Sequence, residues 1–288
     1  MKRIAISGNR HQDGYFPELQ QLVNSLALRD FSVYMRRRLA DYLRENGVQI
    51  PDTFKLVEDF PEEAQCVISL GGDGTFLKVA QWVGNREIPI LGINTGHLGY
   101  LASYSLEETD ELLGIIEGDR GEIERRALLE VKSNALPSDF WPYALNEVAV
   151  LKAESASMVT VHAEIDGGFL ADYLADGLVV STPTGSTAYN LSAGGPILQP
   201  TLRCVVLSPI APHSLTMRPL VVAGTSEISL RATSRSDYCR VSLDGRSFVM
   251  KCGEELRLSR ASFSVMLMRR PDANFARLLR SKLLWGKR

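Results

Sequence analysis

Apolar residues follow two alternating spacings in the first third of the chain. A short apolar run at residues 3–6 is typical of a strand, whereas apolar residues between 19 and 26 recur at the spacing of one helical face. A second helical pattern covers residues 33–45 and ends at the Asn46-Gly47 pair, which is a helix stop signal. We therefore predict a strand followed by an extended helical stretch from Leu19 to Glu45.

The same alternation continues to about residue 120. Residues 66–70 (CVISL) and 88–93 are continuous apolar runs, as buried strands have, and residues 75–83 between them predict a helix. Ser105 followed by Glu108 is a capping box, which marks the start of another helix. Strands that alternate with helices in this way predict an α/β domain with a parallel sheet.

From about residue 121 the pattern changes to short segments rich in β-branched residues. Turn pairs such as Asp166-Gly167 and Asp244-Gly245 separate them, which predicts a β-rich, sandwich-like domain. Helical spacing returns through Phe275, Leu278 and Leu279, so we expect a terminal helix that packs back on the first domain. The predicted parts are an α/β domain at 1–120, a β-rich domain at 121–268 and the helical segment 269–288, with a ligand cleft between the two domains.

Composition and charge exclude several classes of protein. The 288 residues are 45% hydrophobic and 23% charged, which is typical of a globular protein. The 32 basic residues balance 34 acidic ones, so no basic excess favours nucleic-acid binding. No apolar run is long enough to span a membrane, and we expect a soluble, cytoplasmic protein. The four cysteines lie far apart and form no C-x-x-C pair, so we expect buried thiols and neither a zinc site nor a disulfide framework.

A glycine-rich turn, Gly71-Gly72-Asp73-Gly74-Thr75, follows the strand at 66–70. A strand, tight turn and helix in this order present backbone N–H groups to an anion, and glycines let a phosphate approach. A carboxylate beside a phosphate would repel it, so a carboxylate at this position is expected to have a further function. It could accept a hydroxyl proton or hold Mg²⁺. The alternative is an ordinary turn in which Asp73 caps the helix. Lys78 lies one helical turn further on, where it could reach a phosphate or be solvated.

Hydroxyl, amide and aromatic side chains are concentrated at residues 176–198 among glycines and prolines. Such a loop suits a ligand with sugar hydroxyls, amides and flat rings, although it could also satisfy its own hydrogen bonds. Asn146 and Glu147 begin a predicted strand and could bind a ribose diol, but such pairs are also common in edge strands. His97 and His213 could each act as a base or serve a structural role.

The turn at 71–75, the segment 94–100, Asn146-Glu147 and the run at 176–198 together resemble, in order and spacing, the NAD kinase family. The GGDGT turn alone is shared with diacylglycerol and sphingosine kinases and resembles that of phosphofructokinases, whereas DGLVVSTPTGSTAYNLSAGGPI is far more specific. The resemblance implies transfer of the γ-phosphate of ATP to the 2′-hydroxyl of the adenosine ribose of NAD, with Mg²⁺ or another divalent cation. It also implies a homo-oligomer, either a dimer or a tetramer, built through the β-rich domain.

The resemblance also assigns roles to individual residues. It implies that Asp73 is the proton acceptor and that Gly74 touches the dinucleotide, while Lys78 lies near the phosphates. Gly71, Gly72 and Thr75 are the other predicted phosphate-binding residues. The NAD-binding residues that it implies, besides Asp73 and Gly74, are Asn146, Glu147, Asp176, Thr187, Ala188, Tyr189, Asn190, Leu191 and Ser192. Arg246, a further candidate contact, stands where relatives carry glutamine or asparagine, and Leu174 where some carry a basic residue.

The predicted chemistry leaves two other functions open. In phosphoryl transfer to an alcohol, catalysis consists of alignment, charge neutralisation and proton removal, and Asp73 is the acid placed for the last task. A lipid kinase or another small-alcohol kinase could share the turn, but it would have no use for a dinucleotide loop. A catalytically silent NAD sensor would keep the loop, but it would have no use for Asp73.

Overall fold

The structure is a computed structural model that describes residues 1–10, 12, 14–96, 99–118, 120–153, 158–270, 274–283 and 285–286. The chain divides into two compact units, Met1–Arg125 with Val265–Arg288, and Arg126–Ser264. The boundaries fall inside two long strands, β7 (Glu122–Lys132) and β18 (Glu255–Arg269). In the described ranges, no helix is long and apolar enough to cross a membrane.

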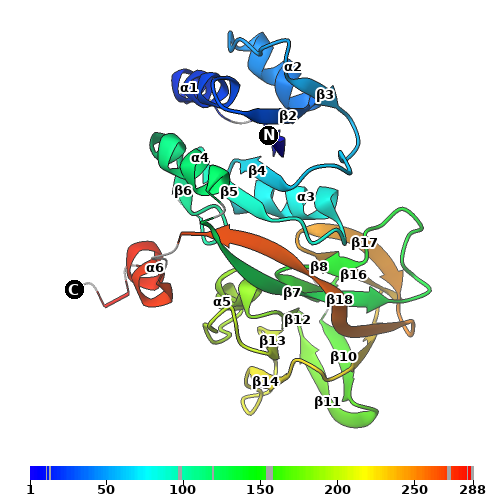
Figure 1. Cartoon of the computed structure of the whole chain (residues 1–288). Coiled ribbons are helices and arrows are strands. Elements are labelled where there is room, and N and C mark those ends of the chain that lie inside the picture. Colours follow the sequence, from blue (N-terminus) through cyan, green and yellow to red (C-terminus); the bar gives the residue numbers. More distant parts are fainter. Residues whose placement is uncertain are drawn as a thin grey trace. The chain divides into compact units, whose positions relative to one another are not determined.

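The first unit is built around a parallel sheet, as the sequence predicts. Its strands lie in the order β6-β5-β4-β1-β2-β3, and the end of β18 also pairs with β5 (Figure 1). The strands are β1 (Lys2–Gly8), β2 (Phe31–Arg36), β3 (Lys55–Val57), β4 (Cys66–Leu70), β5 (Ile90–Asn94) and β6 (Tyr104–Ser105). The helices are α1 (Phe16–Ala27), α2 (Arg37–Glu45), α3 (Asp73–Val83), α4 (Thr109–Glu117) and α6 (Phe275–Lys282), with a short 3₁₀ turn η1 (Leu106–Glu108) before α4.

One predicted helix is wrong in its first part. The interval from Leu19 to Glu45 is not continuously helical, because β2 separates α1 from α2. Three consecutive residues of β2, Val33, Tyr34 and Met35, are buried, and Val33 lies opposite Ile4 of β1 in parallel register. A short apolar run that is buried on both faces belongs to a parallel sheet, and periodicity alone does not separate it from a buried helix.

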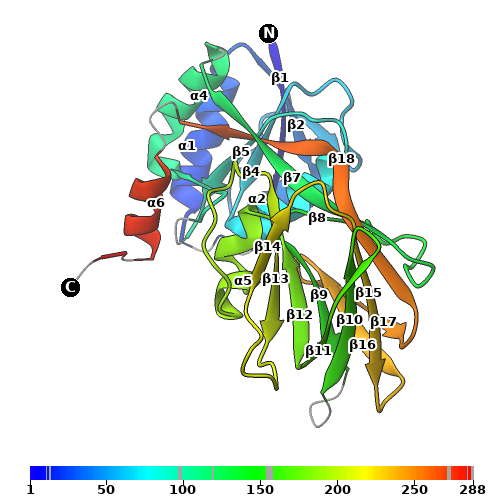
Figure 2. The same cartoon turned by 90° about the horizontal axis from the view of Figure 1, so that it is seen from below.

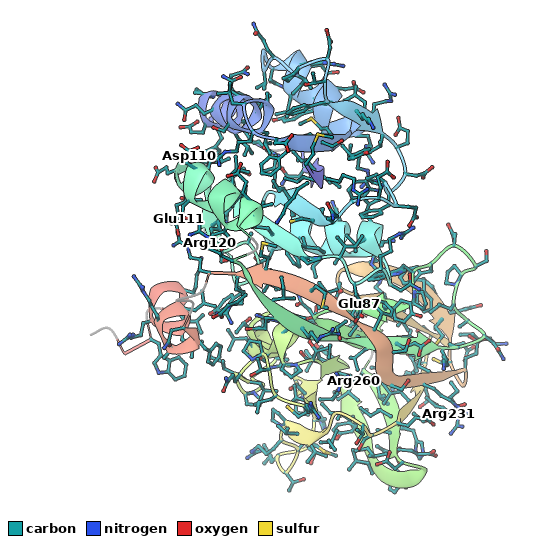
Figure 3. The ribbon with its side chains drawn as sticks, viewed as in Figure 1. Glu87, Asp110, Glu111, Arg120, Arg231 and Arg260 are labelled. Carbon is teal, nitrogen blue, oxygen red and sulfur yellow. The ribbon has the colours of Figure 1, made fainter. Side chains whose placement is uncertain are left out.

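The predicted capping box caps η1, the 3₁₀ turn that leads into α4. The backbone N–H of Ser105 donates to the Glu108 carboxylate at 2.8 Å, and α1 and α4 pack against each other (Figure 2). Two acidic residues in the first turn of α4, Asp110 and Glu111, are labelled in Figure 3. Glu111 forms an ion pair of 3.1 Å with Arg270. This ion pair holds the chain shortly before the terminal helix.

The terminal helix α6 belongs to the first unit. The Asn274 side chain caps it by accepting the backbone N–H groups of Ala276 and Arg277. Its apolar residues Leu278 and Leu279 are only half-buried and are not members of the main core cluster. Each of them therefore stabilises the unit less than a fully buried leucine would.

The second unit contains two antiparallel sheets, which confirms the predicted β-rich, sandwich-like domain. One sheet has the order β14-β13-β12-β9-β16-β17, and the other pairs β11, β10, β15 and β18, with β7 and β8 alongside (Figure 2). Apolar residues of both sheets, many of them valines, form one shared core. The remaining elements are β8 (Tyr143–Ala144), β9 (Glu147–Lys152), β10 (Val159–Ile165), β11 (Gly168–Ala175), β12 (Gly177–Ser181), η2 (Thr184–Thr187), α5 (Tyr189–Ser192), β13 (Cys204–Ile210), β14 (Leu220–Ala223), β15 (Ile228–Ser234), β16 (Tyr238–Leu243) and β17 (Arg246–Lys251).

The cysteines differ in burial more than the sequence suggests. All four are free thiols, and Cys66 and Cys239 are buried, but Cys204 and Cys252 are half-buried, so the expectation of four buried thiols is wrong for two of them. Folding also brings Cys239 and Cys252 together, because the end of β17 turns back beside β16. Burial, with a contribution from Cys252, raises the pKa of Cys239 to about 12, which keeps this thiol unreactive.

Candidate functional site

The glycine-rich turn of the first unit joins β4 to α3 and exposes backbone donors. Helix α3 begins at Asp73, and Gly72 is its N-cap residue without any side-chain cap. In the described part of the chain, no group accepts the N–H groups of Gly72, Asp73 or Gly74. Gly71 has a φ of 138°, and a Cβ there would lie 2.5 Å from the Thr75 hydroxyl. The turn therefore requires glycine and offers three N–H groups to an anion.

Asp73 does not cap its own helix. Its carboxylate reaches across to the segment after β5, where Oδ2 accepts the N–H of Tyr100 at 2.8 Å. Its Oδ1 accepts the N–H groups of Leu101 at 2.9 Å and Ala102 at 3.1 Å. A carboxylate has about four acceptor sites, so one site on Oδ2 remains among the described residues. The Asp73 carboxylate packs directly against the backbone of Gly99, because a Cβ on Gly99 would lie 1.9 Å from Oδ1.

The last residue of α6 brings a cation toward this carboxylate. Burial lowers the pKa of Lys282, and the Asp73 carboxylate opposes that shift by attracting the ammonium. The terminal helix thus contributes a positive charge to the surroundings of the glycine-rich turn. Sequence reasoning missed this role, because basic residues at the end of a helix are also expected from the helix dipole.

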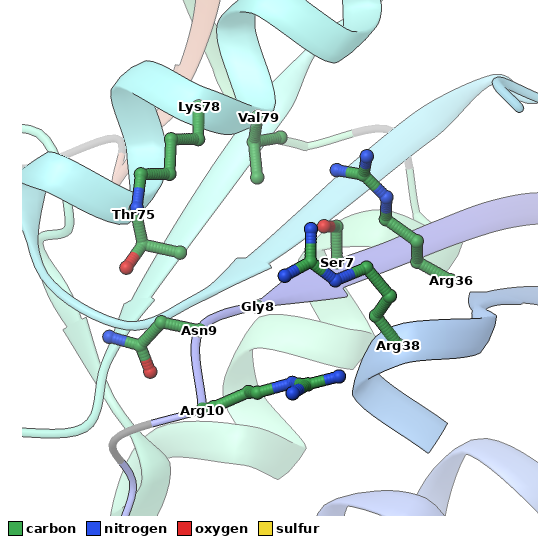
Figure 4. A pocket seen from close by; sticks show the side chains of 9 residues that line it. All are labelled: Ser7, Gly8, Asn9, Arg10, Arg36, Arg38, Thr75, Lys78 and Val79. Atoms are coloured by element: carbon green, nitrogen blue, oxygen red, sulfur yellow. The ribbon is translucent and has the colours of Figure 1, made fainter. Parts of the chain in front are cut away.

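A cationic pocket of about 240 Å³ adjoins the turn in the first unit (Figure 4). The ends of β1 and β2 and the first turns of α2 and α3 surround it. The lining residues are Ser7, Gly8, Asn9, Arg10, Arg36, Arg38, Thr75, Lys78 and Val79. Two of these, Thr75 and Lys78, were predicted to bind phosphate, and both lie in this arginine pocket.

The three arginines were not predicted as site residues. Arg10 follows Gly8-Asn9 at the end of β1, a position at which open α/β sheets bind ligands, so its location was a usable signal. Arg36 and Arg38 belong to a stretch that was interpreted as one helix. Because β2 ends at Arg36 and α2 begins at Arg37, this junction instead lies at the carboxyl edge of the sheet.

In the second unit, a hairpin turn holds the predicted Asn146-Glu147 pair. Asp244, at the β16–β17 turn, accepts the backbone N–H groups of Leu145 at 2.7 Å, Asn146 at 2.8 Å and Glu147 at 3.1 Å. The Asp244 carboxylate is buried, and burial raises its pKa, although these three N–H groups oppose the shift. Sequence analysis identified Asp244-Gly245 only as a turn pair, so this anchoring role was missed.

Glu147 is a second acid at this position with a raised pKa. Its side chain is 8% exposed, and Oε2 has no hydrogen-bond partner among the described residues. Burial and the nearby Asp244 carboxylate raise the pKa of Glu147 to about 7, while the backbone N–H of Tyr189 opposes the shift. The neighbouring Asn146 side chain is half-buried and has no hydrogen-bond partner in the described part of the chain. The pair therefore offers an unused amide and an unused carboxylate oxygen.

Much of the hydroxyl-rich segment satisfies its own hydrogen bonds. Asn190 is buried and donates to the carbonyls of Ser186 and Pro196, while its oxygen accepts the Ser208 hydroxyl at 2.7 Å. Ser186 in turn accepts the backbone N–H of Leu198 at 3.0 Å. The inner half of the loop therefore matches the alternative in which the loop satisfies its own hydrogen bonds. In this structure Asn190 stabilises that half of the loop.

The outer half of the segment remains accessible. The predicted contact residues Thr187, Ala188 and Leu191 are half-buried, and Tyr189 and Ser192 are exposed. Gly185 seats the loop on the strand end, because a Cβ there would lie 2.2 Å from the Asn146 carbonyl oxygen. The loop therefore presents a hydroxyl and an aromatic ring close to the Asn146-Glu147 pair.

The other predicted residues of the second unit have partners within it. Asp176 forms an ion pair of 2.7 Å with Lys152. Arg246 donates to the carbonyls of Trp141 and Tyr143 and stacks on the Phe140 and Trp141 rings, so it supports that loop. His213 is exposed, and its backbone N–H donates to the carbonyl of Leu174 at 2.9 Å. His97 lies outside the described residues.

Comparison with known proteins identifies relatives for the whole chain. The family model for the ATP-NAD kinase N-terminal domain matches residues 6–120, and the model for the C-terminal domain matches residues 145–269. A curated protein named NAD kinase from Porphyromonas gingivalis is 43% identical over 99% of both chains. One of the same name from Bacteroides fragilis is 40% identical over 99% of this chain and 98% of its own.

Two solved structures share the fold. An NAD kinase from Archaeoglobus fulgidus in complex with ATP is 30% identical, with a TM-score of 0.72 and coverage of 93% of this chain and 94% of its own. Yeast NADH kinase complexed with NADH superposes with a TM-score of 0.87 at 24% identity, covering 100% of this chain and 89% of its own.

Proposed function

Because the chain belongs to the ATP-NAD kinase family, we propose that it transfers the γ-phosphate of ATP to the 2′-hydroxyl of the adenosine ribose of NAD, giving NADP. The observation that carries this proposal is the position of Asp73 in an anion-binding turn, with one acceptor site left on Oδ2. That site can accept the proton of an attacking hydroxyl while the adjacent N–H groups bind the phosphate.

In the first unit, the turn and its helix act on the phosphates. The N–H groups of Gly72, Asp73 and Gly74, with the side chains of Thr75 and Lys78, would hold the phosphate that is transferred. The three backbone donors from residues 100–102 fix the Asp73 carboxylate, so the base is oriented before substrate binds.

In the second unit, the residues around Glu147 would bind NAD. The unused Oε2 of Glu147 can accept ribose hydroxyls, and the Asn146 amide can both donate and accept. Thr187 and Tyr189 would add a hydroxyl and a ring surface, and Asp176, Ala188, Leu191 and Ser192 are further proposed contacts. The role of Asn190 in this proposal is to hold the loop.

A divalent cation would arrive with ATP. No group of three or more metal-ligating side chains lies together within the residues described. Mg²⁺ is commonly held by the substrate phosphates, water and one or two carboxylates. Since the one remaining acceptor site of Asp73 serves the attacking hydroxyl in this proposal, the phosphates and water would hold the cation. When bound, the cation would neutralise charge on the transferred phosphate.

A single assay separates this function from the two alternatives. The protein is incubated with NAD, ATP and Mg²⁺, and NADP is measured with an NADP-specific dehydrogenase. Formation of NADP supports the kinase. Binding of NAD without NADP formation would favour an NAD sensor, and phosphorylation of a diacylglycerol or sphingosine substrate in place of NAD would favour a lipid kinase.

A further inference from the structure

The arginine pocket concentrates four cations in one small volume. Arg10, Arg36, Arg38 and Lys78 all line it, and none of its described lining residues is acidic or aromatic. Figure 4 shows the guanidinium groups of Arg36 and Arg38 on the Ser7 side, opposite Thr75. Positive charges this close repel one another unless an anion lies between them, so the pocket favours a multiply charged anion.

The partners of the individual arginines separate the pocket from the surrounding surface. Arg37 is not among the described lining residues and forms an ion pair of 2.9 Å with Glu58. Arg36 is half-buried and lies over the Trp82 ring. Burial and the nearby Arg38 guanidinium lower the pKa of Arg36, while the attraction of Glu58 and Asp59 opposes this shift. Arg36 is thus partly removed from water. An anionic partner stabilises such a partly buried charge more than it would a fully solvated one.

The size of the pocket limits what it can enclose. Its volume is about 240 Å³, below the roughly 300–1,000 Å³ of sites that enclose a whole small-molecule ligand. Its described lining also provides no ring on which a base could stack. The pocket therefore suits a short chain of phosphates better than a nucleoside.

We propose that the arginine pocket binds the two phosphates of the donor that are not transferred, and that Arg36 and Arg38 stabilise the diphosphate leaving group. This inference rests on the proposed kinase function. Thr75 links the two sites, because it lines the pocket while its hydroxyl lies against Gly71 of the turn. One phosphate chain can therefore extend from the turn into the pocket.

The chemistry explains why cations are needed at this end of the donor. The 2′-oxygen of the ribose forms a bond to the γ-phosphorus, and its proton passes to Asp73. The bond from the γ-phosphorus to the bridging oxygen breaks, and its electron pair stays on the β-phosphate. Negative charge develops there, so guanidinium groups placed at the β-phosphate stabilise the transition state and the bound diphosphate product.

The test measures binding of ADP, AMP and inorganic diphosphate to the 288-residue chain by calorimetry. The wild type should bind ADP at least about tenfold more tightly than AMP, because the second phosphate adds charged hydrogen bonds. The Arg36→Met/Arg38→Met double variant should lose at least about tenfold in affinity for ADP and for diphosphate, and the ADP-to-AMP margin should shrink. Its KM for ATP should rise while its KM for NAD stays unchanged.

Arg37→Met is the matched control, because Arg37 lies between the two arginines in sequence but pairs with Glu58. It should leave ADP binding as in the wild type. Arg38→Met alone, at an exposed position, provides a second variant if loss of the Arg36 contact with Trp82 lowers the melting temperature. Unchanged ADP affinity in the folded variants, or an equal loss in the Arg37 control, would overturn the inference.

The outcome also separates this inference from the proposed function. NADP formation by a double variant with wild-type ADP affinity and KM for ATP would reject the leaving-group site and leave the kinase standing. In the opposite outcome, the wild type binds ADP but makes no NADP, while the variants lose ADP binding. This result would reject the kinase and with it the leaving-group role.

Discussion

The buried carboxylate of Asp244 accepts the backbone N–H of Glu147 at 3.1 Å, so a hairpin turn fixes the start of another strand. This bond places two carboxyl groups in one buried region of the second unit. Three backbone N–H groups and the attraction of Arg246 favour the ionised form of Asp244, and the backbone N–H of Tyr189 favours that of Glu147. Burial outweighs these interactions and raises the pKa of both carboxyl groups.

Glu147 should make stability depend on pH. Its pKa is about 7 in the folded protein against an ordinary value of 4.5, so the folded state keeps a proton that the unfolded state releases. Stability from this group is fully present below pH 4.5 and declines until about pH 7, by on the order of 2–3 kcal/mol. Glu147→Gln should remove this decline. Denaturant unfolding at pH 5 and pH 8 measures it, and parallel changes in both proteins would contradict the assignment.

Glu147→Gln should also weaken NAD binding selectively. The amide keeps the size of the side chain, but it replaces one acceptor oxygen with a donor, so ribose hydroxyls lose a charged acceptor. We expect KM for NAD to rise about tenfold while KM for ATP hardly moves. Steady-state kinetics with each substrate varied in turn gives both values. Equal effects on the two substrates would mean that Glu147 serves only the fold.

Local sequence patterns predicted much of the fold. The strand at Cys66–Leu70, the turn after it and the capping box at Ser105 each depend on neighbouring residues, so they could be identified directly. The strand at Phe31–Arg36 could not, because an apolar triplet fits a helix as well as a strand until its parallel partner is known.

The candidate site was predictable only in its local parts. The residue types in the turn and at Asn146-Glu147 carry their own chemistry. The partners of Asp73 are 27 to 29 residues away, and Asp244 is 97 residues from Glu147. The residues that neighbour either motif in the sequence therefore do not predict these hydrogen bonds. The arginine pocket likewise forms only when the ends of two strands and the first turns of two helices meet.

Gly185→Ala should displace the hydroxyl-rich loop. The new Cβ would lie 2.2 Å from the Asn146 carbonyl oxygen, a distance that forces the backbone apart. We expect a lower melting temperature and a loss of NAD affinity, because the loop and Asn146 separate. Gly168→Ala is the matched control, since its Cβ meets nothing closer than 3.4 Å. A wild-type Kd for NAD in Gly185→Ala would show that the loop does not bind the dinucleotide.

Asp73→Asn should nearly abolish NADP formation. Removal of a general base costs about 10²-fold or more in turnover. The structure adds a second effect, because the Asn amide can serve the two N–H groups now on Oδ1 but would then face the Tyr100 N–H with its own donor. The segment at 100–102 should loosen slightly, while the change in NAD affinity stays small. Calorimetry and single-turnover rates separate these effects, and more than about a tenth of wild-type turnover would exclude Asp73 as the base.

Lys282→Met should lower turnover without preventing substrate binding. The Lys282 ammonium offsets the charge of Asp73, and without it the carboxylate would face the incoming phosphates uncompensated. We expect kcat to fall about tenfold, which corresponds to about 1.4 kcal/mol of transition-state stabilisation. Lys282→Arg keeps the charge and should recover most of the loss. Arg280→Met, an exposed residue on the same helix, should behave as the wild type.

The melting temperature distinguishes this electrostatic role of Lys282 from a structural one. Loss of the charge alone should lower kcat without changing the melting temperature, and Lys282→Arg should restore kcat. A helix that merely packs less well would lower the melting temperature and the amount of active protein. A reduced kcat that accompanies a lower melting temperature in both variants would therefore assign Lys282 to the packing of α6.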